Sequence, residues 1–211
     1  MKRKIPFNVN AYTARLIGRE NVSSLDGAIL ELVKNTYDAD ATICILYYDK
    51  KEETLYLMDN GCGMNEQIIE EHWMNIGNSS KYRDYITKKG RVQTGAKGIG
   101  RFALDRVGNS CTMYTKNSKD NEIIEWSVDW GDFERKKNLT DVTATIDKIN
   151  QKNVFSALKI MNKEIEGILK ENFNDTGTIF KIDNLSDLWT DDLIESIREK
   201  LSSLIPPDIE N

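Results

Sequence analysis

The order of helix-forming and strand-forming segments in this 211-residue chain predicts an α+β fold: a mixed, mostly antiparallel sheet with helices on one face. Two observations support this prediction. The runs "ATICILYYD" (41–49) and "ETLYLMD" (53–59) are rich in β-branched and aromatic residues, and a polar turn separates them, which is typical of a hairpin. Helical and strand patterns also fail to alternate one by one, as a parallel sheet would require.

Capping residues and apolar periodicity predict the helices. Ser23 or Ser24 can cap a helix that runs to about Tyr37, and Asn65 can cap a second one. In "GAKGIGRFALDRVG" (95–108) a glycine turn leads into a third helix. Residues 1–20 form a lead-in to which no element is assigned. The remaining segments are predicted as helices at 153–172 and at 190–205, where Thr190 can cap the second one, and as strands at 111–116, 123–130, 141–149 and 177–185.

Composition excludes several classes of protein. The net charge of −5 and the pI near 5.1 do not indicate a mainly electrostatic nucleic-acid binder, because no excess of Lys and Arg exists to neutralise phosphates. Three scattered cysteines are too few for a disulfide framework or a zinc site. No apolar run approaches the ~20 residues of a membrane span, and no signal peptide follows the basic N-terminus. We therefore expect a cytoplasmic protein that does not use a membrane.

The first predicted helix has two stripes. Leu25, Ala28, Ile29, Leu32 and Val33 share one face. Glu31, Asn35 and Asp38 recur at i, i+4 and i+7, so they lie within about a 60° arc of another face. A solvated polar face explains this spacing as well as a functional one does.

Two glycine-containing turns complete the pattern. In "LMDNGCGM" an apolar strand runs into Asp59, followed by Gly61, Gly63 and Met64. This pattern indicates either a simple turn or a hydrogen-bond acceptor beside glycines that permit another group to approach the backbone closely. In "TGAKGIGRFALDRVG" glycines and Lys97 precede a helix, an arrangement suited to phosphates. A dinucleotide fingerprint is excluded because no buried strand precedes it, and a P-loop is excluded because Ala96 stands where its lysine should be.

These clusters resemble, in type and order, the GHKL superfamily of ATPases, whose nucleotide-binding domain has the Bergerat fold, a two-layer α/β sandwich. The resemblance rests on "ELVKNTYDA" (31–39), "DNGCGM" (59–64) and "GAKGIG" (95–100), with "GTIFKI" (177–182) similar to the strand that closes the adenine pocket. It covers roughly residues 20–185. The closest similarity is to bacterial MORC- and chaperone-like ATP-binding proteins.

The resemblance implies binding of ATP or ADP with Mg²⁺ and a role for each residue. Glu31 would orient and deprotonate the attacking water, Asn35 would ligate Mg²⁺, and Asp38 would line the same site. Asp59 would accept a hydrogen bond from the adenine amine, beside Thr178. The other implied nucleotide-binding residues are Gly61, Gly63, Met64, Ser80, Lys81, Gly95, Lys97, Gly98, Ile99 and Gly100.

The resemblance also implies a domain organisation. Residues 1–211 would form a single ATP-binding domain with a mobile ATP lid at 77–94 and a helical insertion at 153–172. Residues 190–211 would be a terminal helix and a linker to a further domain, which in relatives supplies a lysine to the γ-phosphate. Hydrolysis by this chain alone would then be slow, and ATP would drive a conformational switch or a homodimer in a larger protein.

Three alternatives remain on sequence grounds. The chain could be a nucleotide-sensing module with negligible hydrolysis, an interaction domain with an empty pocket, or a histidine-kinase-like catalytic module. Against the last, kinases place a second asparagine where Asp38 stands, and the lone His72 falls in an unrelated helix. These motifs do not identify the molecule on which an ATP-driven switch would act, whether DNA, a polypeptide or another subunit.

Overall fold

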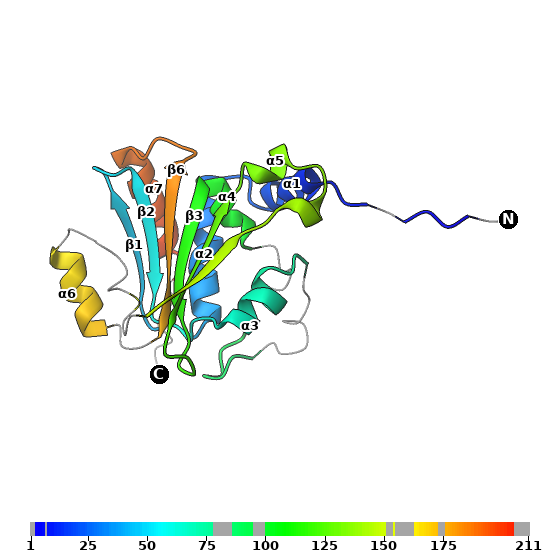
Figure 1. Ribbon diagram of the computed structural model, residues 1–211. Helices are drawn as coiled ribbons and strands as arrows, with labels where there is room; N and C mark the ends of the chain where they lie inside the picture. The colour runs from blue at the N-terminus through cyan, green and yellow to red at the C-terminus, as the bar shows by residue number, and fades with distance from the viewer. Residues whose placement is uncertain are drawn as a thin grey trace.

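The computed structural model describes residues 3–6, 8–77, 86–94, 100–150, 154, 163–172 and 176–204, and the structural statements that follow concern these residues. One six-stranded sheet dominates it, with strand order β1-β2-β6-β3-β4-β5 (Figure 1). All five strand pairings are antiparallel, so the predicted antiparallel character is confirmed and this sheet contains no parallel pair. The strands are β1 (Cys44–Asp49), β2 (Thr54–Asp59), β3 (Gly108–Lys116), β4 (Ile123–Asp129), β5 (Thr145–Ile149) and β6 (Gly177–Leu185).

The helices start where the predicted caps place them. The Ser24 side chain accepts from the Gly27 amide, the Asn65 side chain from the Ile68 amide, and Thr190 from the Leu193 amide. After Asn65 the α-helix lasts one turn and continues as a π-helical turn. The helical elements are α1 (Ala11–Asn21), α2 (Leu25–Asp38), α3 (Glu66–Ile68), η1 (Ile69–Trp73), α4 (Phe102–Val107), α5 (Asp132–Arg135), η3 (Leu139–Asp141), α6 (Lys163–Asn172) and α7 (Asp191–Ser202).

Most of the helices cover one face of the sheet, and α6 covers part of the other. The apolar stripe of α2 is buried as predicted and packs with Leu55 and Leu57 of β2. Met58 points to the opposite face, where it packs with Ile179 of β6 and Leu169 of α6. Side chains alternate between the faces of a strand, so burial on both faces explains why every residue of β2 is buried.

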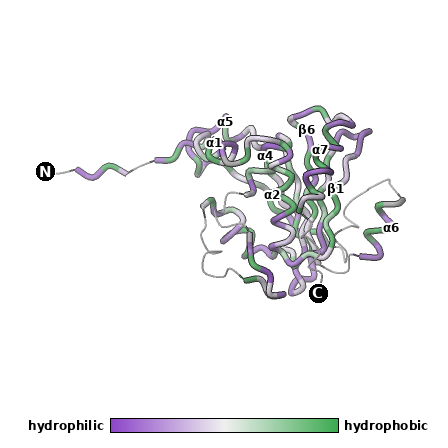
Figure 2. Tube along the Cα trace, turned by 180° about the vertical axis from the view of Figure 1, so that it is seen from behind, coloured by the Kyte–Doolittle hydropathy of each residue, from purple (hydrophilic) through white to green (hydrophobic). Residues whose placement is uncertain are grey.

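Helix α1 was not predicted, because its pattern is inverted. Tyr12, Leu16 and Ile17 are exposed, whereas the charged Arg15 is buried. A periodicity search looks for apolar residues on the inner face and finds none larger than alanine here. Residues 3–6 extend away from the body of the molecule (Figure 1 and Figure 2).

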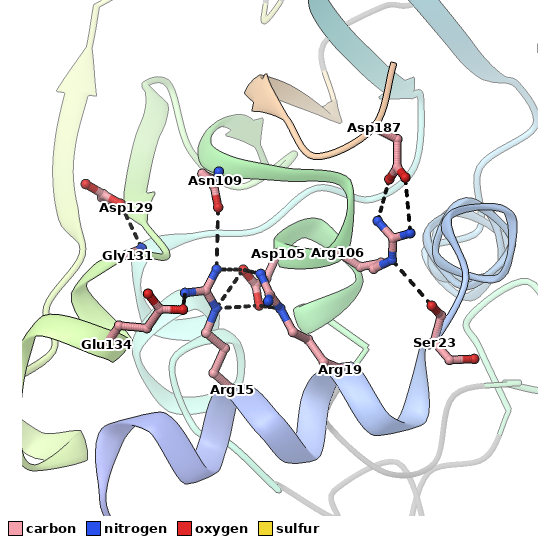
Figure 3. A network of polar contacts seen from close by, with 10 residues as sticks. All are labelled: Arg15, Arg19, Ser23, Asp105, Arg106, Asn109, Asp129, Gly131, Glu134 and Asp187. Carbon is pink, nitrogen blue, oxygen red and sulfur yellow. Dashed lines mark hydrogen bonds and ion pairs between the residues drawn. The ribbon is translucent and has the colours of Figure 1, made fainter. Parts of the chain in front are cut away.

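A buried ion pair holds α1 to α4 (Figure 3). Arg15 is 3% exposed and Asp105 is 0% exposed, and Arg15 Nη2 lies 2.8 Å from Asp105 Oδ1. Arg19 Nε donates to Asp105 Oδ2 at 3.0 Å, and Arg15 Nη1 reaches Glu134 Oε1 at 2.7 Å. Each oxygen of the buried carboxylate therefore has a charged donor, which offsets the cost of its desolvation.

Removing this carboxylate should destabilise the fold strongly. Asp105→Ala leaves the buried Arg15 with only the half-exposed Glu134 as an acidic partner, so we expect a loss of about 3–5 kcal/mol in the free energy of unfolding. The matched control is Asp129→Ala, because Asp129 pairs with Arg135 where both side chains are more than half exposed. That control should lose at most about 1 kcal/mol in urea unfolding. Equal losses in the two variants would contradict this role of Asp105.

Candidate functional site

Three strand ends meet at one edge of the sheet, the lower edge in Figure 1. Strand β2 ends at Asp59, which pairs with Thr178 near the start of β6. Thr178 also pairs with Thr115 near the end of β3. The antiparallel order thus brings the end of "LYLMD" and the start of "GTIFK" together, although more than a hundred residues separate them.

Asp59 is the buried acidic group of this edge. Its side chain is 3% exposed, and Oδ1 accepts a hydrogen bond from the Gly61 amide at 2.8 Å. Burial raises the pKa of the Asp59 carboxyl to about 7, and backbone hydrogen bonds from Gly61 and Thr178 oppose that rise. No cation of the described residues contributes to this pKa shift by offsetting the carboxylate charge. A ligand that donates a hydrogen bond would therefore find a strong acceptor here.

Thr115 joins the two sides of the pocket and was missed in the sequence. Its hydroxyl oxygen accepts from the Met64 amide at 2.8 Å and lies 3.2 Å from the Gly177 carbonyl oxygen. It is also 3.1 Å from the hydroxyl of Thr178. Thr115 is fully buried. A threonine in the strand segment "CTMYTK" carries no signal of this role until β3 is known to lie beside β6.

Two glycines permit the close approach of backbones around Asp59. Gly63 has φ +60°, and a Cβ there would lie 2.0 Å from the Lys116 carbonyl oxygen. Gly177 has φ +151°, and a Cβ there would lie 2.3 Å from the Asp59 carbonyl oxygen. Side chains fit at neither position, so these glycines are required by the fold of the pocket itself.

Each residue of the polar stripe of α2 has a defined neighbour. Asn35 adjoins Gly100, because a Cβ built on Gly100 would lie 3.3 Å from Asn35 Nδ2. Asp38 Oδ1 accepts from the Thr94 amide at 2.8 Å. Glu31 is about 38% exposed, and its Oε1 accepts from Lys34 Nζ at 2.9 Å.

The end of α2 is tied directly to the turn after β2. The Cys62 amide donates to the Ala39 carbonyl oxygen at 2.9 Å. Asn60 Oδ1 accepts from the Thr42 and Ile43 amides at 2.8 and 3.0 Å. The two sequence clusters are thus neighbours in space, as a shared site requires.

The structure brings some of the predicted site residues together and does not describe others. Glu31, Asn35, Asp38 and Gly100 lie on or beside α2. Asp59, Gly61, Gly63, Met64 and Thr178 lie at the strand ends, where Met64 also packs against the main core. Ser80, Lys81, Gly95, Lys97, Gly98 and Ile99 lie outside the described residues, as do residues 153 and 155–162 of the predicted insertion at 153–172.

The donor set fits a nucleotide with its magnesium ion. The described residues contain no group of three His, Cys, Asp or Glu side chains that could hold a metal by themselves. Mg²⁺ is commonly held by one or two protein oxygens together with phosphates and water, so the single amide oxygen of Asn35 suits it. The buried Asp59 carboxylate suits an exocyclic amine, as a hydrogen-bond acceptor beside the Thr115 and Thr178 hydroxyls.

The antiparallel sheet, the buried acid at a strand end, the glycines beside it and the acid–amide stripe on the covering helix are compatible with a nucleotide-binding domain. The sequence profile of the histidine kinase-, DNA gyrase B- and HSP90-like ATPases matches residues 22–164. The chain belongs to this family, and the predicted GHKL membership is confirmed.

Three relatives illustrate the similarity. The chain is 31% identical over 106 residues to a putative type II restriction enzyme HgiDII of Herpetosiphon aurantiacus, covering 50% of this chain and 17% of that protein. It is 33% identical over 97 residues to ATPase MORC2B of Mus musculus (44% and 9%) and 29% identical over 94 residues to chaperone protein HtpG of Bacillus licheniformis (43% and 15%). The chain thus spans less than a fifth of the length of each of these relatives.

None of the helices in the described part of the chain is both long enough and apolar enough to cross a membrane.

The raised pKa of Asp59 predicts how stability depends on pH. The folded value of about 7 exceeds the ordinary value of 3.8, so between them the folded protein holds a proton that the unfolded chain releases. This contribution to stability is complete below pH 4 and is lost as pH rises through 7. In urea unfolding, the free energy of unfolding of the wild type should fall by about 2–3 kcal/mol between pH 5 and pH 8, relative to that of Asp59→Asn. A difference between the two proteins that stays constant with pH would contradict the assignment.

Proposed function

We propose that this chain is a Mg-ATP-binding and ATP-hydrolysing domain. The observation that supports it best is the buried Asp59 carboxylate beside Thr178, in a strand end whose following turn is tied to the end of α2 through the Cys62 amide and the Ala39 carbonyl. Adenine carries an amino group that a buried acceptor can recognise, and the phosphates would extend toward α2 and the glycine-rich stretch 95–100. Membership of an ATPase family supports the same nucleotide.

In this proposal the residues of α2 act on the phosphate end of the nucleotide. Asn35 would supply an amide oxygen to Mg²⁺, which when bound neutralises phosphate charge. Glu31 would orient a water and accept its proton. One Glu31 oxygen already accepts from Lys34 at 2.9 Å, which leaves Oε2 for that water. Lys97 and the glycine-turn amides would hold the phosphates, and Ser80 and Lys81 would contribute from the lid at 77–94.

We further propose that residues 1–211 act as one domain of a larger protein, in which ATP drives a conformational or dimerisation switch. The short coverage of each relative supports a larger context. Under this proposal the chain works in the cytoplasm, with a downstream domain or partner protein.

Replacing the proposed base should separate binding from hydrolysis. Glu31→Ala removes the proton acceptor and leaves Asn35 and Asp59 in place, so we expect hydrolysis to fall ~10²–10⁴-fold with nearly unchanged ATP affinity. Single-turnover release of labelled phosphate gives the rate, and calorimetry gives the affinity. The matched control is Glu195→Ala, because Glu195 also pairs with a basic residue at i+3, on α7.

Two outcomes of this experiment would contradict parts of the proposal. Hydrolysis by Glu31→Ala at the wild-type rate would remove Glu31 from its role as base. Transfer of the labelled phosphate to protein rather than to water would indicate a kinase module.

The Glu31→Ala variant, saturated with ATP, should sediment as a dimer, and a monomer at all nucleotide concentrations would remove dimerisation from the proposal.

A further inference from the structure

Asp40, just after α2, has a backbone conformation and a burial that call for an explanation. It has φ +61°, a left-handed conformation that is uncommon outside glycine, and its residue surface is only 8% exposed. Backbone hydrogen bonds hold it there, from its own amide to the Tyr37 carbonyl and from the Ala41 amide to the Thr36 carbonyl. The Asp40 side chain is thereby fixed relative to the helix that carries Glu31 and Asn35.

Both oxygens of the Asp40 carboxylate are used by the segment 86–94. The Thr87 hydroxyl donates to Oδ1, and the Lys89 amide donates to Oδ2 at 3.1 Å. Lys89 Nζ also donates to the Asp40 carbonyl oxygen at 2.9 Å. One residue at the end of α2 therefore receives three donors from a segment almost fifty residues further along the chain.

Arg91 makes the attachment rigid. Its Nη1 donates to the carbonyl oxygens of Ala41 at 2.7 Å and Tyr37 at 3.2 Å. Its guanidinium lies over the Tyr37 ring, 4.7 Å from the centroid, a cation–π distance. The Arg91 amide donates back to the Thr87 hydroxyl oxygen at 3.0 Å, so both halves of the attachment share Thr87.

The attached segment ends at the proposed phosphate site. The amide and the hydroxyl of Thr94 both donate to Asp38 Oδ1, at 2.8 and 3.1 Å. The next residue in the sequence is Gly95, the first of "GAKGIG". The entry to the glycine-rich stretch is thus held against the same helix that carries Asn35, and its place is set by contacts that start at Asp40.

We infer that Asp40 is a positioning residue for the phosphates of the nucleotide. Its contacts with Thr87 and Lys89 hold 86–94 on the end of α2, which places Thr94, the residue that precedes the glycine-rich stretch in the sequence, at Asp38. This inference rests on the proposed function, because it assigns the phosphate side of that same pocket. Among the described residues, the hydrogen bonds of Asp59, Thr115 and Thr178 do not include the Asp40 side chain, and the Cys62–Ala39 bond that links the two regions uses backbone atoms only. A change of the Asp40 side chain should therefore leave the adenine side intact.

Comparing ATP with adenosine tests this division. Asp40→Asn keeps the size of the side chain and tolerates the left-handed backbone, but it weakens the acceptors for Thr87 and Lys89. We expect calorimetry to show ATP affinity about tenfold lower with adenosine affinity unchanged. Thr87→Val should give the same pattern, and Thr87→Ser, which retains the hydroxyl, should restore wild-type affinity for ATP.

The matched control is Asp49→Asn. The Asp49 carboxylate accepts from the Lys51 and Glu52 amides in the turn between β1 and β2, at the opposite end of these strands from Asp59. That variant should bind both ligands as wild type does.

The remaining outcomes overturn one claim or the other. Equal losses of ATP and adenosine affinity in Asp40→Asn and Thr87→Val would mean a general structural role and would contradict the inference. Unchanged affinity for both ligands in these variants would also contradict it, while the proposed function stands. Wild-type protein that binds neither ligand would contradict the proposed function, and the inference with it.

Discussion

Burial of the Asp59 carboxylate is the constraint around which the pocket is arranged. Burying this carboxylate costs free energy, because Asp59 is only 3% exposed and no cation of the described residues contributes to its pKa shift. Its pKa, raised to about 7 by burial, reflects that cost. The neighbouring backbone offsets part of the cost through the Gly61 amide. Gly177 lets β6 come close enough to cover the acid. A ligand with an amino group would give the buried carboxylate a further donor, so the cost of burying Asp59 and the selectivity of the site would have the same origin.

The helical layer gives that pocket a fixed second wall. The apolar stripe of α2 packs on the sheet, and its polar stripe lies beside Gly100 and Thr94. Helix α4, which follows Gly100 directly, is held to α1 by the buried pair of Arg15 and Asp105 (Figure 3). Both elements beside the proposed phosphate site are therefore anchored by buried contacts. Rigid elements on either side favour a site in which the segment between them can be positioned accurately.

Local chemistry predicted much of this from sequence, and long-range contacts account for what was missed. The caps Ser24, Asn65 and Thr190 and the two stripes of α2 depend on neighbours within one or two turns, so the sequence reveals them. Thr115 matters only because β3 lies beside β6, and α1 is held through Arg15 by an acid ninety residues away. The candidate site residues were identified through the family resemblance, because a family has a known topology, whereas hydrophobic periodicity says nothing of which strands are neighbours.

Discrimination between ATP and GTP tests the central claim most directly. Adenine presents an amino group where guanine presents a carbonyl oxygen, and an ionised carboxylate attracts the first and repels the second. At pH 8, where Asp59 is mostly ionised, calorimetry should show ATP binding at least about tenfold more tightly than GTP. Asp59→Asn should lose most of that preference. Equal affinity of the wild-type protein for the two nucleotides would contradict the assignment of this pocket to adenine.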